Sequence, residues 1–155
     1  MREILDFTAQ LKSDIRLDDK FIVKKENRYF LLNNELKPYV QKEFYHAGVY
    51  LGKTKNHRFF PSLNLLAMMA RGKANKITVD SKSEWLFICG RDIFKQGIIE
   101  TSKPREKGEY TLVVNQHGEC IGFGRLLCDH KNVKDPRRVV VKNISDIGDF
   151  LRRER

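Results

Sequence analysis

The sequence predicts an α+β protein: an N-terminal α/β domain with an antiparallel sheet (residues 1–72) precedes a C-terminal domain built mainly of short strands (residues 73–155). Three observations predict this. Apolar residues make up 41% of the chain and include ten Phe, which suits a packed core rather than a disordered chain. Helical and alternating apolar patterns both occur before residue 71. After the polar segment Arg71–Asn75, taken as a flexible boundary, short strands follow at even spacing, as in a small barrel.

The N-terminal half is expected to begin with an amphipathic helix over residues 2–15, where apolar side chains recur at helical spacing. Four strands should follow, and the first two read as a hairpin. They are expected at Lys20–Lys25, Arg28–Asn33, Gly48–Thr54 and His57–Phe60.

Two further helices are expected in this half. Leu36–Tyr45 reads as helical because Pro38 suits a first turn. Ser62–Ala70 reads as a short apolar helix with Ser62 as its N-cap, after Pro61 ends the preceding strand. The apolar segment Leu63–Met69 could serve a protein partner, but we expect it to pack in the core.

The C-terminal half should alternate strands with two helices and two basic loops. A turn at Gln116–Gly118 should join the two central strands in a hairpin. In chain order we expect strand Ile77–Val79, helix Ser81–Phe94 interrupted at Gly90, strand Gly97–Thr101, loop Lys103–Gly108, strands Glu109–Asn115 and Glu119–Leu127, loop Lys131–Arg138, strand Val139–Lys142 and helix Ser145–Arg153.

Charge is the clearest compositional signal. Thirty Lys and Arg against twenty Asp and Glu give a net charge of +10, which predicts a polyanionic partner. The excess is +5 in residues 1–72 (13 basic, 8 acidic) and +5 in residues 73–155 (17 basic, 12 acidic). Because the halves are equal, a binding site must be found from local clusters.

Localisation follows from what the sequence lacks. No apolar run approaches the roughly 20 residues of a membrane helix, and the first ten residues do not resemble a signal peptide. The three cysteines contain no CxxC motif, so we expect buried free thiols in a reducing compartment. We therefore expect a cytoplasmic protein, nucleolar if its source is eukaryotic, with no membrane partner.

Two glycine-containing motifs could suggest nucleotide binding. Ala47–Thr54 (AGVYLGKT) fits a relaxed phosphate-loop pattern, but its middle positions favour a strand, and Pro61 leaves no room for the helix that must follow. Gly118–Gly124 (GECIGFG) lacks the third glycine of the dinucleotide fingerprint. We expect ordinary strands at both, with a bulge or a close backbone approach at the glycines of the second, where an RNA backbone could also come close.

No catalytic or metal centre is expected. The spacing of Cys120, Cys128 and His130 matches no structural zinc pattern. The histidines are scattered, no Ser or Cys lies in a nucleophile motif, and Asp18 and Asp19 read as solvated. We expect no enzyme activity and no cofactor.

Basic clusters in the C-terminal half are the strongest functional signal. A single cluster is often just a solvated face, but four around one small β domain favour phosphate contact. The clusters comprise Arg91 and Lys95; Lys103, Arg105 and Lys107; Lys131, Lys134, Arg137, Arg138 and Lys142; and Arg152, Arg153 and Arg155.

The same half resembles a PUA domain, in Gly90–Ile98 (GRDIFKQGI), Gly118–Leu126 (GECIGFGRL) and Arg137–Asn143 (RRVVVKN). With Leu51–Ala70 (LGKTKNHRFFPSLNLLAMMA) and Asp135–Arg153 (DPRRVVVKNISDIGDFLRR), the whole chain resembles the nuclear import protein seven family of large-subunit ribosome biogenesis factors. The resemblance implies an N-terminal α/β domain, a C-terminal PUA-type pseudo-barrel and non-catalytic binding of pre-ribosomal RNA.

The resemblance also implies where RNA would bind. One side of the groove would be the turn around Arg91, Lys95 and Gly97, where a residue without a side chain lets RNA come close. The other side would be the strand and loop around Arg125, Arg137, Arg138 and Lys142. Three further candidates are Arg105, Arg152 and Arg153.

The leading hypothesis is therefore a monomeric RNA-binding factor. It would act on structured or uridine-rich segments of pre-ribosomal RNA, together with other large-subunit assembly factors. Two alternatives stay open at this point: an accessory RNA-binding subunit of an RNA-modification complex, and a protein adaptor between assembly factors.

Overall fold

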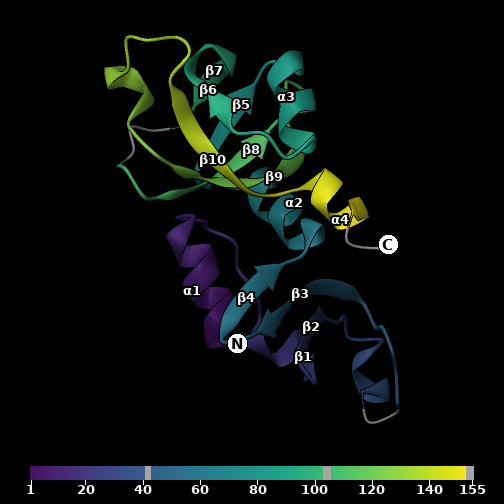
Figure 1. Cartoon of the computed structure of the whole chain (residues 1–155). Helices are drawn as coiled ribbons and strands as arrows, with labels where there is room; N and C mark the ends of the chain where they lie inside the picture. The colour runs from purple at the N-terminus through teal and green to yellow at the C-terminus, as the bar shows by residue number, and fades with distance from the viewer. Residues whose placement is uncertain (41–42, 103–105, 153–155) are drawn as a thin grey trace.

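The computed structural model describes residues 1–40, 43–102 and 106–152. Two sheets lie one above the other with helix α2 (Leu63–Arg71) between them (Figure 1). The first sheet has strand order β1-β2-β3-β4, and the second has order β6-β10-β9-β8-β5-β7. The predicted α+β class is confirmed, with an antiparallel sheet in the first half and a nearly closed barrel in the second.

The first half contains α1 (Arg2–Gln10), two short 3-10 turns, four strands and α2. The predicted hairpin is confirmed, because β1 pairs with β2 antiparallel, and β3 and β4 form a second antiparallel pair. The strands are β1 (Ile22–Lys25), β2 (Arg28–Leu31), β3 (Val49–Lys55) and β4 (Arg58–Pro61).

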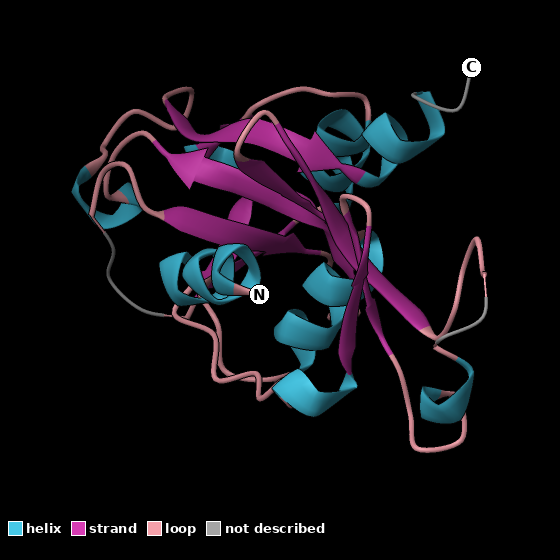
Figure 2. Ribbon diagram, turned by 90° about the horizontal axis from the view of Figure 1, so that it is seen from below, coloured by secondary structure: helices cyan, strands magenta, loops and turns pink. Residues whose placement is uncertain are grey.

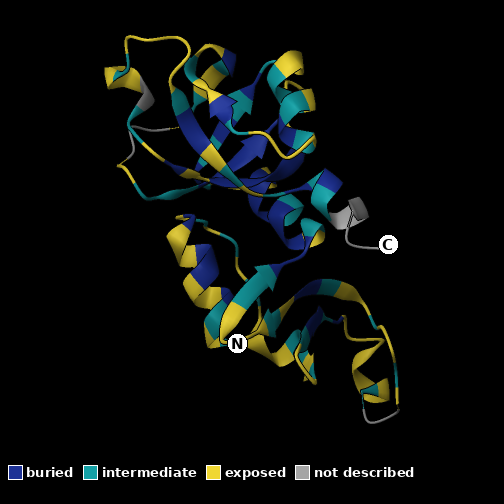
Figure 3. Cartoon of the chain, viewed as in Figure 1, coloured by how far each residue is buried: buried dark blue, intermediate teal, exposed yellow. Residues whose placement is uncertain are grey.

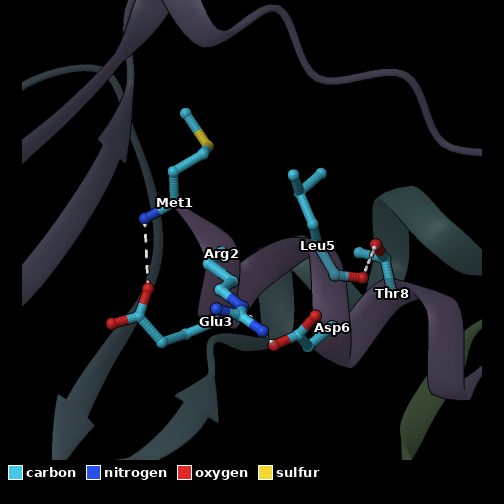
Figure 4. Close-up of polar contacts among 6 residues, drawn as sticks. All are labelled: Met1, Arg2, Glu3, Leu5, Asp6 and Thr8. Atoms are coloured by element: carbon cyan, nitrogen blue, oxygen red, sulfur yellow. Dashed lines mark hydrogen bonds and ion pairs between the residues drawn. The ribbon is translucent and has the colours of Figure 1, made fainter.

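Helix α1 is shorter than the predicted 2–15. It ends at Gln10, and the chain then turns at Lys12, whose φ is +49°. Figure 4 shows the polar contacts that hold its first turns, including the 2.9 Å bond from Thr8 Oγ1 to the Leu5 carbonyl. Seen from below, the helix that starts at the N-terminus lies against the strands (Figure 2).

The predicted helix Leu36–Tyr45 is wrong. Within the described residues this segment contains only the 3-10 turn η2 (Lys37–Tyr39). The turn begins where Asn33 Oδ1 accepts a hydrogen bond from the Leu36 amide at 2.9 Å. Side chains here lie over the sheet instead: the ring of Phe44 packs 5.8 Å from that of Phe30. Tertiary packing on β2 thus overrides the helical pattern.

Helix α2 matches its prediction. Ser62 caps it by accepting a hydrogen bond from the Leu65 amide at 3.1 Å, and Leu65, Leu66 and Met69 are fully buried. The apolar segment Leu63–Met69 is therefore core, as expected, and it offers no exposed apolar stripe for an adaptor role.

The second half is mostly β, as predicted, with two differences. The helix expected at Ser81–Phe94 ends at Ile88, and the last strand extends to Asp146 rather than Lys142. The elements are β5 (Lys76–Val79), α3 (Ser81–Ile88), β6 (Ile93–Phe94), η3 (Lys95–Gly97), β7 (Ile98–Thr101), β8 (Tyr110–Val114), β9 (Cys120–Leu126), η4 (His130–Asn132), β10 (Val139–Asp146) and α4 (Ile147–Arg152).

Both differences have long-range causes. After α3, Gly90 has a φ of +85°. The Asp92 carboxylate accepts a hydrogen bond from the backbone amide of Asn143 at 2.8 Å. Strand β10 extends because Asn143–Asp146 pair with Gly122–Gly124 of β9. A helix after Gly90 would have lost the contact with β10.

Two apolar clusters form the core. The interior of the barrel holds one of them, which includes Ile77, Phe87, Val113 and Val141. The other joins the two halves: Phe7 of α1 and Leu65 of α2 pack with Leu112 of β8 and Phe123 of β9. One face of the second sheet is thus covered by the first half, and Figure 3 shows buried, dark blue segments of the ribbon on both sides of this contact.

The expected boundary segment, Arg71–Asn75, is bonded to both halves. The Lys73 amide donates to Asp14 Oδ1 at 2.8 Å, the Asn75 amide donates to the Leu11 carbonyl at 2.7 Å, and the Leu112 amide donates to the Asn75 carbonyl at 2.7 Å. It is therefore held in place rather than a loose linker. The division into domains 1–72 and 73–155 stays a prediction.

The cysteines differ from one another. Cys120 is buried and Cys128 is half-buried, but Cys89 is exposed, so the expectation of three buried thiols is wrong for Cys89. Burial raises the pKa of Cys120 to about 11. Among the described residues, no helix has the length and apolar character needed to span a membrane.

Candidate nucleic-acid interface

The candidate interface is built on β9 and β10, whose backbones approach closely. A side chain at Gly122 would lie 2.2 Å from the Ser145 carbonyl oxygen, and one at Gly124 would lie 2.5 Å from the Lys142 carbonyl oxygen. The glycines predicted to mark close backbone approach therefore do so, against β10. Ala47–Thr54 likewise leads into the ordinary strand β3 rather than a phosphate loop.

Arg125 and Lys142 form the centre of this interface. They are directly opposite one another in the antiparallel ladder of β9 and β10, and both are exposed. Directly paired residues share a face of the sheet, so their charges lie side by side. Arg125 Nε donates to the Gly108 carbonyl at 3.0 Å. This bond holds the Arg125 guanidinium beside the N-terminal end of β8.

A second group joins the turn after β6 to the loop before β10. The Lys95 amide donates to the Arg138 carbonyl at 2.9 Å, and Lys95 Nζ donates to the Val133 carbonyl. The Gln96 amide donates to the Pro136 carbonyl at 3.0 Å. The turn after β6 and the loop before β10 are therefore bonded together. They lie about 40 residues apart in the sequence, and we predicted them as two sides of one groove.

Arg137 and Arg138 are exposed on this loop. The Arg137 amide donates to Asp135 Oδ1 at 2.9 Å, so the only acidic residue of the basic run is used to shape the backbone. Arg138 precedes β10 directly, which puts it about 13 Å along the strand from Lys142.

Gly97 has a structural reason to be glycine. It is buried, and a side chain there would lie 1.8 Å from Ser83 Oγ at the start of α3. The missing side chain thus allows the turn to pack on α3, which differs from the expected reason, close approach of RNA. A part for Gly97 in RNA binding stays a prediction.

Arg91 is exposed on the turn between α3 and β6, and its position is set by Asn143, which sequence reasoning missed. Asn143 Nδ2 donates to the Phe87 carbonyl at 2.9 Å and to Asp146 Oδ2 at 3.0 Å. It also lies 3.4 Å from the Arg91 carbonyl. Only a long-range contact gives Asn143 this role, so no local sequence pattern could have shown it.

Among the described residues, the cations of this interface have no carboxylate partners. Within residues 1–40, 43–102 and 106–152, ion pairs join Met1 to Glu3, Arg2 to Asp6 and Lys12 to Glu109. None of them involves the six described basic candidates, which are Arg91, Lys95, Arg125, Arg137, Arg138 and Lys142. Apart from Lys95, which is half-buried, these side chains are exposed. Their charge is therefore available to a polyanion.

Three predicted site residues cannot be placed in the same way. Arg105 and Arg153 lie outside the described residues, and Arg152 is described only as part of the backbone of α4. In the described part of the chain, no group of three or more His, Cys, Asp or Glu side chains is placed to hold a metal ion.

The comparison with protein families bears on the same half of the chain. Residues 75–155 match the model of the UPF0113 PUA domain. The chain belongs to the UPF0113 family. The relatives of this UPF0113 chain confirm the resemblance that its motifs suggested, since they include both archaeal UPF0113 and eukaryotic ribosome biogenesis proteins.

Two relatives illustrate this. The UPF0113 protein of Archaeoglobus fulgidus is 30% identical over 113 residues, which are 72% of this chain and 64% of that protein. The 60S ribosome subunit biogenesis protein NIP7 homolog of Danio rerio is 31% identical over 112 residues, which are 70% of this chain and 62% of that protein. The UPF0113 chain thus spans less than two thirds of the length of these relatives.

Solved structures agree on the fold. A conserved PUA domain protein from Thermoplasma acidophilum matches 99% of this UPF0113 chain and 94% of its own length, with a TM-score of 0.65 and 21% identity. A hypothetical protein from Pyrococcus horikoshii matches 94% and 90%, with a TM-score of 0.56 and 16% identity. At these identities the likeness shows the fold alone.

Proposed function

We propose that this UPF0113 protein is an RNA-binding factor of large-subunit ribosome biogenesis. The observation that carries the proposal is a set of cations on β9, β10 and the joined turn and loop that have no carboxylate partner in the described part of the chain. The family adds the biological context, because relatives named as NIP7 homologues are named for 60S subunit biogenesis.

The geometry suits backbone recognition rather than base reading. The in-register pair Arg125 and Lys142 and the loop cations Arg137 and Arg138 would neutralise successive phosphates and release counterions. Phosphate contacts position an RNA without reading its sequence. A preference for uridine-rich segments would then come from their flexible, unstacked bases.

The role we propose needs no catalysis by this chain and no cofactor. It would act as a monomer in the cytoplasm, on pre-ribosomal RNA and beside other large-subunit assembly factors. Neither alternative gains support from a specific contact: the apolar segment considered for an adaptor is buried in the core.

Charge reversal on the loop tests the proposal. Arg137→Glu with Arg138→Glu should weaken binding of a labelled ten-nucleotide oligouridine and of a structured RNA alike, by at least about tenfold at 0.1 M KCl. The slope of log affinity against log salt should become shallower by about 1.4, since each phosphate contact on a single strand contributes roughly 0.7. Lys82→Glu with Arg71→Glu, both exposed and neither among the candidate site residues, serves as the control. An unchanged affinity and slope in the loop variant would refute the assignment.

A further inference from the structure

The first sheet has a face that the proposed RNA-binding interface does not use. Tyr29 and Leu51 of β2 and β3 point into the core. Side chains alternate along a strand, so Arg28 and Phe30 lie on the opposite, outer face. This outer face belongs to the first half of the chain and is formed by β1, β2 and β3 in hydrogen-bonded order.

Three cations form a row across the outer face. Lys25 of β1 is directly opposite Arg28 of β2, and Arg28 is directly opposite Lys53 of β3. Like charges directly opposite one another destabilise a sheet. Within the described residues, no ion pair relieves the repulsion, because the ion pairs found there involve none of the three. The row therefore costs stability in the absence of a bound anion.

Aromatic side chains lie beside this row. Phe30 is 1% exposed, because the rings of Phe44, His46 and Tyr50 cover it at centroid distances of 5.8, 5.3 and 5.6 Å. Lys25 Nζ lies over the Phe44 ring, 4.6 Å from the ring centroid. A hollow of about 100 Å³ opens here, lined by Lys25, Glu26, Arg28, Phe30, Phe44 and Tyr45.

Tyr45 is the most exposed aromatic of this group. Its side chain is 81% exposed, and its ring lies 4.9 Å from the Arg28 guanidinium. A hydrogen bond to Tyr45 raises the pKa of Arg28. The guanidinium lies over one face of the Tyr45 ring, so a planar cation and an exposed aromatic ring lie together beside the hollow.

The local charge also singles out this region. Residues 20–58 hold nine Lys and Arg against three Asp and Glu, a balance of +6. The rest of the first half, residues 1–19 and 59–72, holds four basic and five acidic residues, a balance of −1. The whole positive excess of the first half therefore belongs to the strands and loops around the outer face.

We propose that the outer-face patch, defined as Lys25, Arg28, Phe44, Tyr45 and Lys53, is a second RNA-binding site that takes single-stranded RNA. The cation row would bind phosphates, and Tyr45 with Arg28 would stack on a base. Basic residues that follow the backbone, with aromatic rings that stack on bases, are how proteins bind single strands without sequence preference. A protein segment rich in Asp and Glu could use the cations but would leave the exposed ring without a planar partner.

The charge row is tested with Arg28→Gln and Lys53→Gln in the full chain. We expect at least about tenfold weaker binding of the ten-nucleotide oligouridine at 0.1 M KCl, and a salt slope shallower by about 1.4. The melting temperature should stay unchanged or rise, since repulsion is relieved. The control is Lys24→Gln with Arg71→Gln; Lys24 neighbours Lys25 but is paired with Tyr29 on the other face. Binding equal to that of the control would overturn the proposal.

Stacking is tested separately. Tyr45→Ala should weaken oligouridine binding about fivefold or more without changing the salt slope, because the lost group is neutral. Tyr45→Phe keeps the ring and should bind within twofold of the unchanged chain. A 4-thiouridine-containing oligouridine, crosslinked by light, should label a peptide that contains Tyr45. Absence of this peptide together with unchanged binding by Tyr45→Ala would reject the stacking site.

The two RNA sites can be distinguished by repeating these measurements on the Arg137→Glu, Arg138→Glu background. If the outer-face patch is a separate site, its variants lose affinity on either background. If the proposed C-terminal site fails its own test, the patch variants still weaken binding and the inference stands. A labelled deca-glutamate that binds the patch more tightly than oligouridine, with the same dependence on Arg28 and Lys53, would assign the patch to an acidic protein partner instead and overturn the proposal.

Discussion

Arg125 on β9 and Lys142 on β10 are cross-strand neighbours, and both are exposed without a carboxylate partner in the described part of the chain. Two like charges in this arrangement lower the stability of a sheet. The chain keeps them where the glycines of β9 bring two backbones unusually close. This relationship is the basis of the proposed interface, because the cost in stability is offset if a polyanion binds there.

Replacing Arg125 and Lys142 with neutral residues should weaken RNA binding without lowering the stability of the fold. Arg125→Gln with Lys142→Gln is expected to weaken oligouridine binding about tenfold at 0.1 M KCl, with a salt slope shallower by about 1.4. The melting temperature should not fall, because the repulsion between the two side chains is removed. Fluorescence anisotropy and thermal unfolding on the same preparation measure both. A fall in melting temperature with unchanged affinity would show that the pair serves the fold instead.

Gly97 should tolerate no side chain. Gly97→Ala would place a methyl group 1.8 Å from Ser83 Oγ, so the turn or α3 must shift. We expect a loss of about 1–3 kcal/mol in the free energy of unfolding, as for other overpacked sites. Urea unfolding measures it. Ser83→Ala removes the hydroxyl oxygen, so the double variant should lose less stability than Gly97→Ala alone; an equal loss would point to strain from another source.

Cys120 should make stability fall at alkaline pH. Its pKa is raised from 9.0 to about 11 by burial, so the folded protein holds the thiol proton more tightly than the unfolded chain. The protonated thiol makes its full contribution to the free energy of unfolding below pH 9. As the pH rises through 11, up to about 2–3 kcal/mol of that free energy is lost. Cys120→Val removes this titration. Urea unfolding at pH 8, 9, 10 and 11 should show a smaller decline in the variant, and parallel declines would contradict the account.

The two halves should depend on one another. Leu112 and Phe123 are buried by α1 and α2, so a fragment of residues 73–155 would expose an apolar face. We expect this fragment to bind the dye ANS and to melt below the full chain. A fragment that melts at the temperature of the full chain and binds no dye would show that the predicted domain is independent.

Local chemistry explains what the sequence predicted well. The Ser62 cap, the hairpin of β1 and β2 and the strands with alternating apolar residues depend on neighbours along the chain, and they were found within one or two residues. The helix predicted over Leu36–Tyr45 was wrong because Phe44 packs on Phe30, a contact between distant residues. The extension of β10 was missed for the same reason, since only pairing with β9 keeps Asn143–Asp146 extended.

The candidate interface likewise has one part that the sequence predicted and another that depends on long-range contacts. Net charge and basic runs pointed to the Arg137–Lys142 segment directly. The pairing of Arg125 with Lys142 and the bonds from the Lys95 turn to the loop needed the register of the strands. The row formed by Lys25, Arg28 and Lys53 was not found from sequence at all, because these residues belong to three different strands.

The most direct test of the central claim is crosslinking of the protein to RNA in its own cells, followed by sequencing of the bound RNA. The account predicts that reads concentrate on precursors of large-subunit ribosomal RNA, and that Arg137→Glu with Arg138→Glu removes most of this enrichment while Lys82→Glu with Arg71→Glu keeps it. Reads spread over cellular RNA without enrichment of these precursors, or enrichment that survives the loop variant, would contradict it.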